Sequence, residues 1–435
     1  MSKRRKKSKL KALFLIIILI IFMYFFIKSI FFANTDNNSL LLNNNDKTNL
    51  IDIINTSESN SNIIEKKFAS GMNIEDFTKI NNQKDNYLKS DDSYKQLKYN
   101  FNYKLHYSKI EEYLKELNNS EIVKLELIGV SVDKRNIYSV EIGKGNKTLL
   151  IDANIHSAES GNTLILLKYM IDIVNKYENK NKDIVEKLNN YKIVILPCIN
   201  PDGYEVYNYG IEVINNRDLW IYKNKDNIDF ENFKFNANGV DINRNMPTQN
   251  AGLYYKDKAL INSVAFEKTT KNGIYFGGSS LGSEPETKAL MYFMLKHFKN
   301  TFAYINMHSQ GRVIYQGKPN LNSKFNDKSN SLAKYVSKDN NYIVYGIESE
   351  EVAEGNDGSA TDFMAELANG FLFSSKTGRL SIDKYNGQTN FKYNYGVITV
   401  ETIKTYTDDP SYFKTEYYDY NYFNLFTNLL STNSY

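Results

Sequence analysis

The chain has 435 residues, of which 42% are apolar and 24% charged, a globular composition long enough for one large domain. Its formal net charge is +4, but residues 1–28 carry eight positive side chains and no acid, which leaves 4 − 8 = −4 for the remainder. This mildly acidic body gives no support for nucleic-acid binding, which requires a basic face. The single cysteine, Cys198, excludes an intramolecular disulfide, and its place after the apolar run 193–196 predicts a packed thiol.

The N-terminal region has the pattern of a membrane anchor. Sixteen apolar residues at positions 12–27 are followed by Lys28, Ser29 and further apolar residues up to Ala33, and seven basic side chains precede the run. The length predicts a single transmembrane helix within residues 1–33, and the charges predict a cytoplasmic N-terminus with the rest of the chain extracellular. A cleaved signal peptide, which would release a secreted protein, is the alternative.

Residues 34–95 are rich in Asn, Asp, Ser and Lys and predict a polar flexible tether with a short helix around Ile74–Ile80. Residues 96–435 show alternating strand and helix patterns, which predict one α/β domain with a mixed, mainly parallel sheet and helices on both faces. The predicted elements, in chain order, are an amphipathic helix at 108–117, hairpin strands at 123–129 and 135–142, a buried strand at 148–153, a helix at 162–177, a buried strand at 191–196, a helix opened by a capping box at Ser283–Glu286, and buried strands at 302–307 and 397–400.

Two of the four histidines follow predicted strands. His156 comes after an apolar strand and precedes Glu159 by three residues, so an imidazole and a carboxylate can point to one place. His308 ends another strand, at the sheet edge where α/β proteins bind ligands. Two His and one Glu with an open fourth position are typical of catalytic zinc, although H-x-x-E alone also fits a polar turn. His106 and His297 are interpreted as solvated or capping residues.

Further motifs stand in a characteristic order along the chain. They are Asn200-Pro201-Asp202-Gly203-Tyr204, Gly239-Val240-Asp241-Ile242-Asn243-Arg244-Asn245, Ser283-Glu284-Pro285-Glu286-Thr287, Asn306-Met307-His308-Ser309-Gln310 and Val397-Ile398-Thr399-Val400-Glu401. Together with H-x-x-E they make residues 95–430 resemble the zinc carboxypeptidase family typified by carboxypeptidase A. The resemblance implies one zinc per chain bound by His156, Glu159 and His308.

The resemblance also implies roles for further residues. Glu401 matches the catalytic glutamate, and Asn243 with Arg244 matches the pair that holds the substrate's free carboxylate. An arginine suits that task because its planar fork donates two parallel hydrogen bonds. Asp241 is interpreted as a buried acid that braces this loop.

Three features of the pattern stay open. The basic residue that polarises the scissile carbonyl is expected among Arg217, Lys223 and Lys234, with Lys234 preferred. The tyrosine that carboxypeptidase A-like enzymes place shortly after a G-S-x-D-W-like element has no counterpart after Gly358–Phe363, where Met364 and Ala365 follow. The segment Ala365–Tyr395 is expected to line the specificity pocket.

The expected activity is zinc-dependent hydrolysis of a peptide bond next to a residue with a free carboxylate. The missing tyrosine and the run His308-Ser309-Gln310-Gly311 are similar to bacterial relatives that cut γ-D-glutamyl–diaminopimelate bonds, so peptidoglycan stem peptides are the expected substrate. A broad extracellular carboxypeptidase is one alternative. A non-catalytic wall- or peptide-binding module with the same fold is another. The expected partners are the peptide substrate and the membrane.

Overall fold

The computed structural model of the protein describes residues 71–90, 92–218, 220, 233–249, 251, 277–317, 323–347, 358–382 and 392–431, all within one compact unit that spans Ile63–Tyr435. The predicted anchor within residues 1–33 and most of the predicted tether lie outside these ranges. Within them, no helix is both long and apolar enough to cross a membrane.

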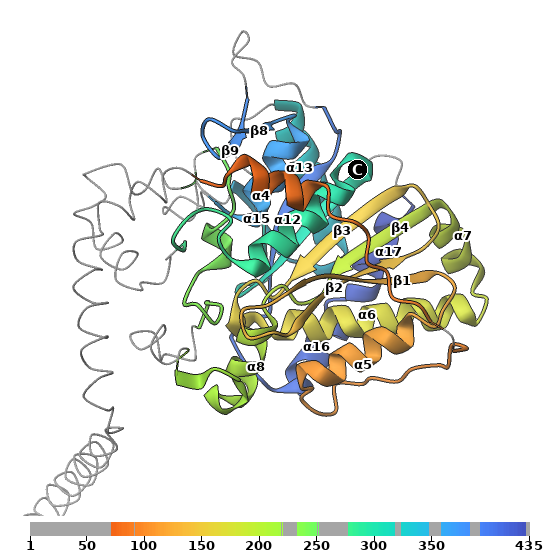
Figure 1. Ribbon diagram of the computed structural model, residues 1–435. Coiled ribbons are helices and arrows are strands. Elements are labelled where there is room, and N and C mark those ends of the chain that lie inside the picture. Colours follow the sequence, from red (N-terminus) through yellow and green to blue (C-terminus); the bar gives the residue numbers. More distant parts are fainter. Residues whose placement is uncertain are drawn as a thin grey trace, which may run out of the picture. The chain divides into compact units, whose positions relative to one another are not determined.

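The described part of the domain is built on a mixed eight-stranded sheet (Figure 1). In spatial order its strands are β1 (Val123–Val130), β2 (Asn136–Ile142), β4 (Tyr191–Leu196), β3 (Lys147–Ala153), β5 (Thr301–Ser309), β10 (Gly396–Thr402), β6 (Val313–Gln316) and β7 (Ile343–Ile347). The central strands β4, β3, β5 and β10 are parallel, β6 and β7 are parallel to each other, and the other neighbouring pairs are antiparallel. This confirms the predicted fold class and the predicted hairpin.

The central strands are largely apolar because both faces of the sheet are covered. Successive side chains of a strand point to opposite faces. In β3, Leu149 and Ile151 accordingly enter one core cluster and Leu150 enters another, and in β4 Ile193 and Val194 divide in the same way. Such strands read as continuous apolar runs in sequence, which is why their positions were predictable.

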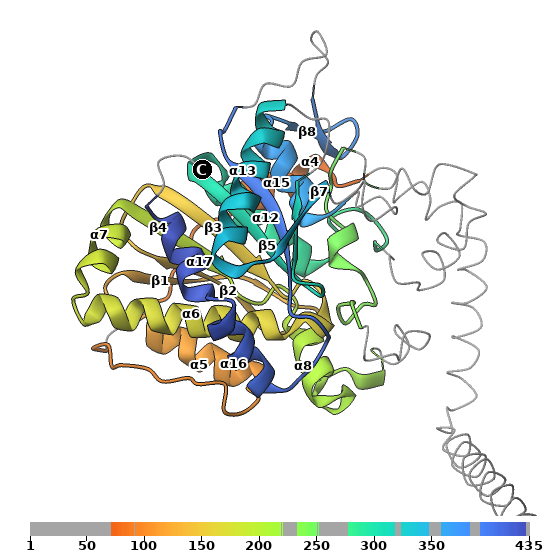
Figure 2. The same cartoon turned by 180° about the vertical axis from the view of Figure 1, so that it is seen from behind.

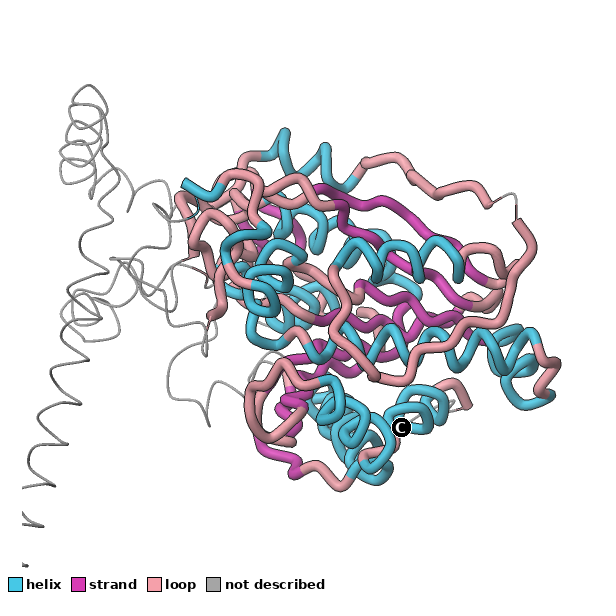
Figure 3. The backbone as a smooth tube through the Cα atoms, turned by 90° about the horizontal axis from the view of Figure 1, so that it is seen from below, coloured by secondary structure: helices cyan, strands magenta, loops and turns pink. Residues whose placement is uncertain are grey.

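Helices lie on both sides of the sheet (Figures 2 and 3). The first face is covered by α5 (Tyr107–Leu117), α6 (Gly161–Glu178), α13 (Ser323–Asn340), α16 (Pro410–Asp419) and α17 (Tyr422–Leu429), with α7 (Lys182–Asn190) against α6. The second face is covered by α4 (Ile74–Asn81), α12 (Pro285–His297) and α15 (Ala360–Ala368). The remaining elements are α8 (Pro201–Tyr209), the short helices at Ser157–Glu159, Ile211–Val213, Ile242–Arg244 and Phe298–Asn300, and the hairpin of β8 (Leu372–Ser374) and β9 (Arg379–Ser381).

The start of the described chain packs against the domain. The predicted short helix is present as α4, capped by the Asn73 side chain, which accepts from the backbone N–H of Asp76. Met72 and Ile80 are buried in the second core cluster, and Tyr87 forms an isolated bridge to Glu126 of β1. The packed domain therefore includes residues 71–90, which the sequence analysis placed in the tether.

Two local predictions were wrong at α12. Ser283 does not cap this helix: the N-cap residue is Glu284, and the Glu286 carboxylate accepts from the backbone N–H of Val132 and from Asn236. His297, interpreted as solvated or capping, is 6% exposed and packs edge-on against Phe293. Burial lowers the pKa of His297 to about 4, so this imidazole is held neutral in the core.

Candidate metal centre

The carboxyl ends of β3, β5 and β10 bring the predicted site residues to one edge of the sheet. His156 follows β3, His308 lies near the end of β5, and Glu401 lies near the end of β10, where it pairs in register with His308. Because side chains alternate along a strand, His308 and Glu401 both project toward the face covered by α12 and α15. The topology thus assembles residues 245 positions apart.

His156, Glu159 and His308 form a tight and buried cluster. Glu159 Oε1 lies 2.7 Å from His156 Nδ1, Glu159 Oε2 lies 3.0 Å from His308 Nδ1, and the two Nδ1 atoms are 3.2 Å apart. The three side chains are 1–6% exposed. Among the described residues this is the group of His, Cys, Asp and Glu side chains whose ligand atoms gather closely enough to hold a metal ion.

The outward nitrogens of both histidines face acceptors. His308 Nε2 is 2.5 Å from the Asn306 side-chain oxygen, and the orientation of that amide is set by its N–H donation to Asp152. His156 Nε2 is 3.3 Å from the Asp241 carboxylate. The Asn306 contact assigns the proton of His308 to Nε2, and the nearby Asp241 carboxylate favours the same tautomer for His156, although His156 Nε2 makes no hydrogen bond to the described residues. A neutral imidazole in this tautomer has its lone pair on Nδ1. These tautomers are assigned from the hydrogen-bond network.

It follows that two imidazole lone pairs and a carboxylate converge on one point. Without a cation between them, these three donors repel one another or must take up protons. Tetrahedral zinc with bonds of about 2.0–2.1 Å places neighbouring ligand atoms roughly 3.3 Å apart, close to the separations seen here. The donor set and its spacing fit zinc.

The residues behind the ligands were not predicted from the sequence. Asp152 is fully buried, accepts from Tyr304 at 2.6 Å and from Asn306, and so fixes the chain of contacts that ends at His308. Burial raises the pKa of Asp152 to about 6, opposed by these hydrogen bonds. Such outer contacts orient metal ligands and fix their tautomers. The available signal was an Asp and an Asn within otherwise apolar buried strands.

The short distances between the three ligand side chains shift the pKa values of Glu159 and His156. Burial raises the pKa of Glu159, but the neighbouring His156 and His308 outweigh it and lower that pKa to about 2. Burial lowers the pKa of His156, but Glu159 and Asp241 outweigh it and raise that pKa. The site therefore favours an ionised carboxylate and attracts positive charge.

The predicted carboxylate-binding loop, Asp241–Asn245, lies against this cluster. Asp241 is fully buried and accepts from the Asn243 backbone N–H at 2.9 Å, which confirms its predicted bracing role, and it also orients His156. Asn243 is 5% exposed, and its side-chain oxygen accepts from the Ala360 N–H at the start of α15, so its NH₂ is the group that can donate to a substrate. Arg244 is half-buried and donates from Nη1 to the Asn243 carbonyl at 2.9 Å.

The three candidates for the carbonyl-polarising base have different surroundings. Arg217 is exposed and pairs with Glu212 at 2.6 Å. Lys223 lies outside the described residues. Lys234 is half-buried. Burial raises the pKa of Asp241, but His156, with smaller contributions from Arg244 and Lys234, outweighs it and lowers that pKa, so Lys234 lies near the site. The role of Lys234 stays a prediction.

The N-P-D-G-Y motif has a structural role beside the centre. Asn200 caps α8 by accepting from the Gly203 N–H at 2.9 Å, and its amide donates to the Phe235 carbonyl at 3.0 Å. Gly203 must lack a side chain, because a Cβ there would lie 2.0 Å from Ser157 Oγ, one residue after His156. The motif therefore packs α8 against the turn that carries the first two ligands.

Comparison with known proteins agrees with this geometry. Residues 110–410 match the model of the zinc carboxypeptidase family, about two thirds of the chain. The chain belongs to the zinc carboxypeptidase family. Zinc is the metal of this family, and His156, Glu159 and His308 form the site that fits it.

Curated relatives of this chain match over part of their length. The catalytic chain of carboxypeptidase N from Homo sapiens is 28% identical over 202 residues, covering 44% of this chain and 39% of that protein. Gamma-D-glutamyl-L-diamino acid endopeptidase 1 from Lysinibacillus sphaericus is 28% identical over 201 residues, covering 45% of this chain and 47% of that protein. The matched part is thus less than half of either relative.

Solved structures show the same fold. Bovine thrombin-activatable fibrinolysis inhibitor, in complex with tick carboxypeptidase inhibitor, aligns with a TM-score of 0.54 at 18% identity over 76% of this chain and 97% of that chain. Carboxypeptidase A from Helicoverpa armigera aligns with a TM-score of 0.53 at 18% identity over 78% of this chain and 76% of that chain.

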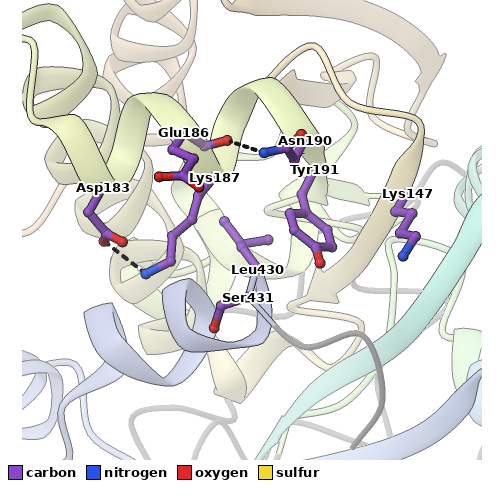
Figure 4. A pocket seen from close by; sticks show the side chains of 8 residues that line it. All are labelled: Lys147, Asp183, Glu186, Lys187, Asn190, Tyr191, Leu430 and Ser431. Atoms are coloured by element: carbon purple, nitrogen blue, oxygen red, sulfur yellow. Dashed lines mark hydrogen bonds and ion pairs between the residues drawn. The ribbon is translucent and has the colours of Figure 1, made fainter.

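A hollow of about 440 Å³ lies at the opposite edge of the sheet, where β3 and β4 begin with Lys147 and Tyr191 (Figure 4). Its charged groups include Lys187 and Asp183, which pair at 2.8 Å. The cluster of His156, Glu159 and His308 lies instead near the carboxyl ends of β3 and β5.

Proposed function

We propose that this protein hydrolyses a peptide bond next to a residue that carries a free carboxylate. The observation that carries the proposal is the convergence of the His156, Glu159 and His308 lone pairs beside Glu401. Zinc, when bound, lowers the pKa of its water to about 7 and polarises the scissile carbonyl. A complete ligand set with Glu401 beside it disfavours the non-catalytic binding module.

The chain's own residues divide the remaining work. Glu401 is held in β10 between β5 and β6, with its backbone in register with His308, and it accepts a proton from water and returns it to the leaving amine. Asp241 holds His156 through Nε2. Arg244, in the loop that Asp241 braces, binds the substrate's free carboxylate with its guanidinium fork.

Within this class, we infer that the substrate is a peptidoglycan stem peptide cut at a γ-D-glutamyl–diamino acid bond. The similarity to the Lysinibacillus endopeptidase, whose name states this bond, supports the inference. So does the lack of a tyrosine directly after Gly358–Phe363, where Met364 and Ala365 follow and are buried in α15. The similarity to human carboxypeptidase N favours the second candidate, a broad carboxypeptidase that trims C-terminal residues.

We further propose that residues 12–33 hold the protein in the cell membrane with the catalytic domain outside. The apolar run and the seven preceding positive charges support this location. N-terminal sequencing of the membrane-extracted protein should begin at or near Met1. A mature chain that begins near Asn34 would instead support secretion.

The decisive experiment compares a peptide with a free C-terminal carboxylate and its C-terminal amide. Removing the carboxylate leaves a desolvated guanidinium without its partner, which costs about 1–3 kcal/mol. The wild type should therefore cleave the amide at least about tenfold less efficiently in kcat/KM. Arg244→Ala should lose this discrimination, whereas Arg217→Ala, an exposed arginine, should keep it.

Equal cleavage of both peptides by the wild type would show that the enzyme does not recognise a carboxylate. Mass spectrometry of purified stem peptides after incubation then separates the two substrate classes. A cut between glutamyl and diamino acid supports the narrower proposal, and removal of only C-terminal residues from general peptides supports the broad carboxypeptidase.

A further inference from the structure

The first described residues of the chain touch two elements that hold the carboxylate-binding loop. We call residues 71–82 the N-terminal strap. The Met72 N–H donates to the Gly378 carbonyl at 2.8 Å, in the turn between β8 and β9. The Met72 side chain is 5% exposed and lies so close to Gly282 that a Cβ there would be 3.0 Å from Met72 Cε.

Gly282 leads directly to the loop. Its N–H donates to the Asn245 carbonyl at 2.6 Å, one residue beyond Arg244. The Asn245 amide is fully buried, donates to the Ser280 carbonyl at 2.9 Å and accepts from the Glu284 N–H at 3.2 Å. The backbone around Gly282 and the Asn245 end of the loop therefore form one hydrogen-bonded unit, against which Met72 packs.

The β8–β9 hairpin approaches the same loop from its other end. The Leu380 N–H donates to the Pro247 carbonyl at 2.8 Å, three residues beyond Arg244. The strap also packs on this hairpin through Phe77, whose ring stacks on Phe373 with centroids 4.0 Å apart. The strap thus contacts both elements that are hydrogen-bonded to the segment Arg244–Pro247, namely the backbone around Gly282 and the β8–β9 hairpin.

We propose that Gly71 and Met72 are positioning residues for the carboxylate-binding loop, so that the first two residues of the strap set the affinity for the substrate's carboxylate. This inference rests on the proposed role of Arg244. Gly71 has φ +69° and sits so close to the hairpin that a Cβ would lie 2.4 Å from the Gly378 carbonyl oxygen. A side chain at Gly71 or a cavity at Met72 displaces the strap. The two elements that hold the loop, the backbone around Gly282 and the β8–β9 hairpin, then lose their contacts with the strap. A displacement of about 1 Å can cost as much as 10²-fold in rate.

Met72→Ala tests the side-chain contact, with Ile80→Ala as the matched control. Both side chains are buried in the same core cluster, at 5% and 7% exposure, so both truncations leave a cavity. We expect Met72→Ala to raise KM for the free-carboxylate peptide roughly tenfold with kcat nearly unchanged. Cleavage of the amidated peptide by Met72→Ala should not change. Ile80→Ala should keep the wild-type ratio of kcat/KM for the free and amidated peptides. Met72→Leu should also keep that ratio, because leucine conserves the side-chain volume.

Gly71→Ala tests the backbone contact, with Gly210→Ala as the matched control. Gly210 also has a positive φ, +79°, but a Cβ there meets nothing within 4 Å, so this substitution adds strain without a clash. Gly71→Ala should reproduce the rise in KM and Gly210→Ala should not. If Met72→Ala does not fold, this glycine pair decides the matter.

Hydrogen exchange of the peptide 241–248 provides a readout that does not depend on activity. We expect roughly tenfold faster exchange there in Met72→Ala and Gly71→Ala, and wild-type exchange in Ile80→Ala and Gly210→Ala. Unchanged exchange and unchanged KM in the first two variants would overturn the positioning role. A wild type that cleaves free and amidated peptides equally, while exchange still rises, would overturn only the role of Arg244.

Discussion

Two buried polar clusters on the same face of the sheet, the metal centre and a cluster beside α12, are built differently. In the second, which we call the α12 cluster, Glu126 is fully buried and accepts from Tyr292 at 2.6 Å and from Lys296 at 2.9 Å, both on α12. Its second acid, Glu141, is 3% exposed and accepts from Lys192 at 3.0 Å and from Tyr87. In this cluster the chain supplies its own cations and donors to every buried carboxylate.

The metal centre has a carboxylate of similar burial, but among the described residues no lysine or arginine is bonded to it. Glu159 faces the Nδ1 atoms of two histidines; the Nε2 of His308 contacts the Asn306 side-chain oxygen, and the Nε2 of His156 lies 3.3 Å from the Asp241 carboxylate. A cluster that neutralises itself holds a fold together, whereas a cluster of converging lone pairs requires a cation from outside. A structural ion-pair network is therefore recognised by N–H and O–H groups that point at its carboxylates. A metal site is recognised by lone pairs that point at one another.

The largest effect is expected from removing two ligands. The wild-type protein, after dialysis, should contain one zinc per chain, and the His156→Ala, His308→Ala double variant should contain almost none and have no measurable activity. Metal analysis by mass spectrometry measures this. The control is Glu126→Gln with Lys296→Met, which dismantles the α12 cluster and should keep zinc. Full zinc content in the double histidine variant would refute the ligand assignment.

The next effect concerns the acid beside the ligands. Glu401→Gln should keep the fold and the zinc but lower kcat/KM by about 10²–10⁴-fold, because the variant cannot accept a proton from water. Glu126→Gln, which changes a buried carboxylate away from the ligands, is the matched control and should stay close to the wild type. A Glu401→Gln enzyme within threefold of the wild-type value would contradict the catalytic role.

The smallest effect is a pH dependence of the free energy of unfolding, which arises from His297 beside the α12 cluster. The unfolded chain protonates His297 near pH 6.5, whereas burial, with Lys296 nearby, lowers the folded-state pKa to about 4. The folded state therefore binds fewer protons between these values, so this contribution to stability is complete above pH 6.5 and is lost as pH falls toward 4. The loss amounts to about 3 kcal/mol at most.

Urea unfolding of the wild type and of His297→Asn between pH 7 and pH 4 measures this contribution. As the pH falls, the wild type should lose stability relative to the variant. The substitution His106→Asn, at a side chain that is 55% exposed, serves as the control. Parallel pH curves for the wild type and His297→Asn would show that His297 is protonated as readily in the folded protein as in the unfolded chain.

Features set by neighbouring residues were predictable from the sequence. The buried strands β3, β4 and β5 were visible as apolar runs, and His156 with Glu159 was visible because three residues separate two side chains that share a turn. His308 was visible at the end of a predicted strand, whereas the role of Glu401 came from the family resemblance and stays a prediction. Parallel pairing places the two residues in register. The α/β class followed from the alternation of these elements.

Features that depend on distant partners were not predictable. Asp152 receives its hydrogen bond from Asn306, 154 positions away, so nothing near it in sequence showed that it orients a metal ligand. Glu286 looked like part of a capping box because its spacing was right, but Val132 and Asn236 bind it instead. His297 looked solvated beside Lys296, since its burial depends on the sheet beneath α12.

The packing of the strap has a practical consequence for producing the enzyme. A recombinant protein that starts near residue 95, where the polar composition ends, would omit Met72, Phe77 and Ile80. It would leave bare the apolar surface that these side chains cover, including the ring of Phe373. Exposed apolar patches of this kind promote aggregation. A soluble version should therefore begin before Gly71, and low yields from shorter versions would reflect a missing piece of the core.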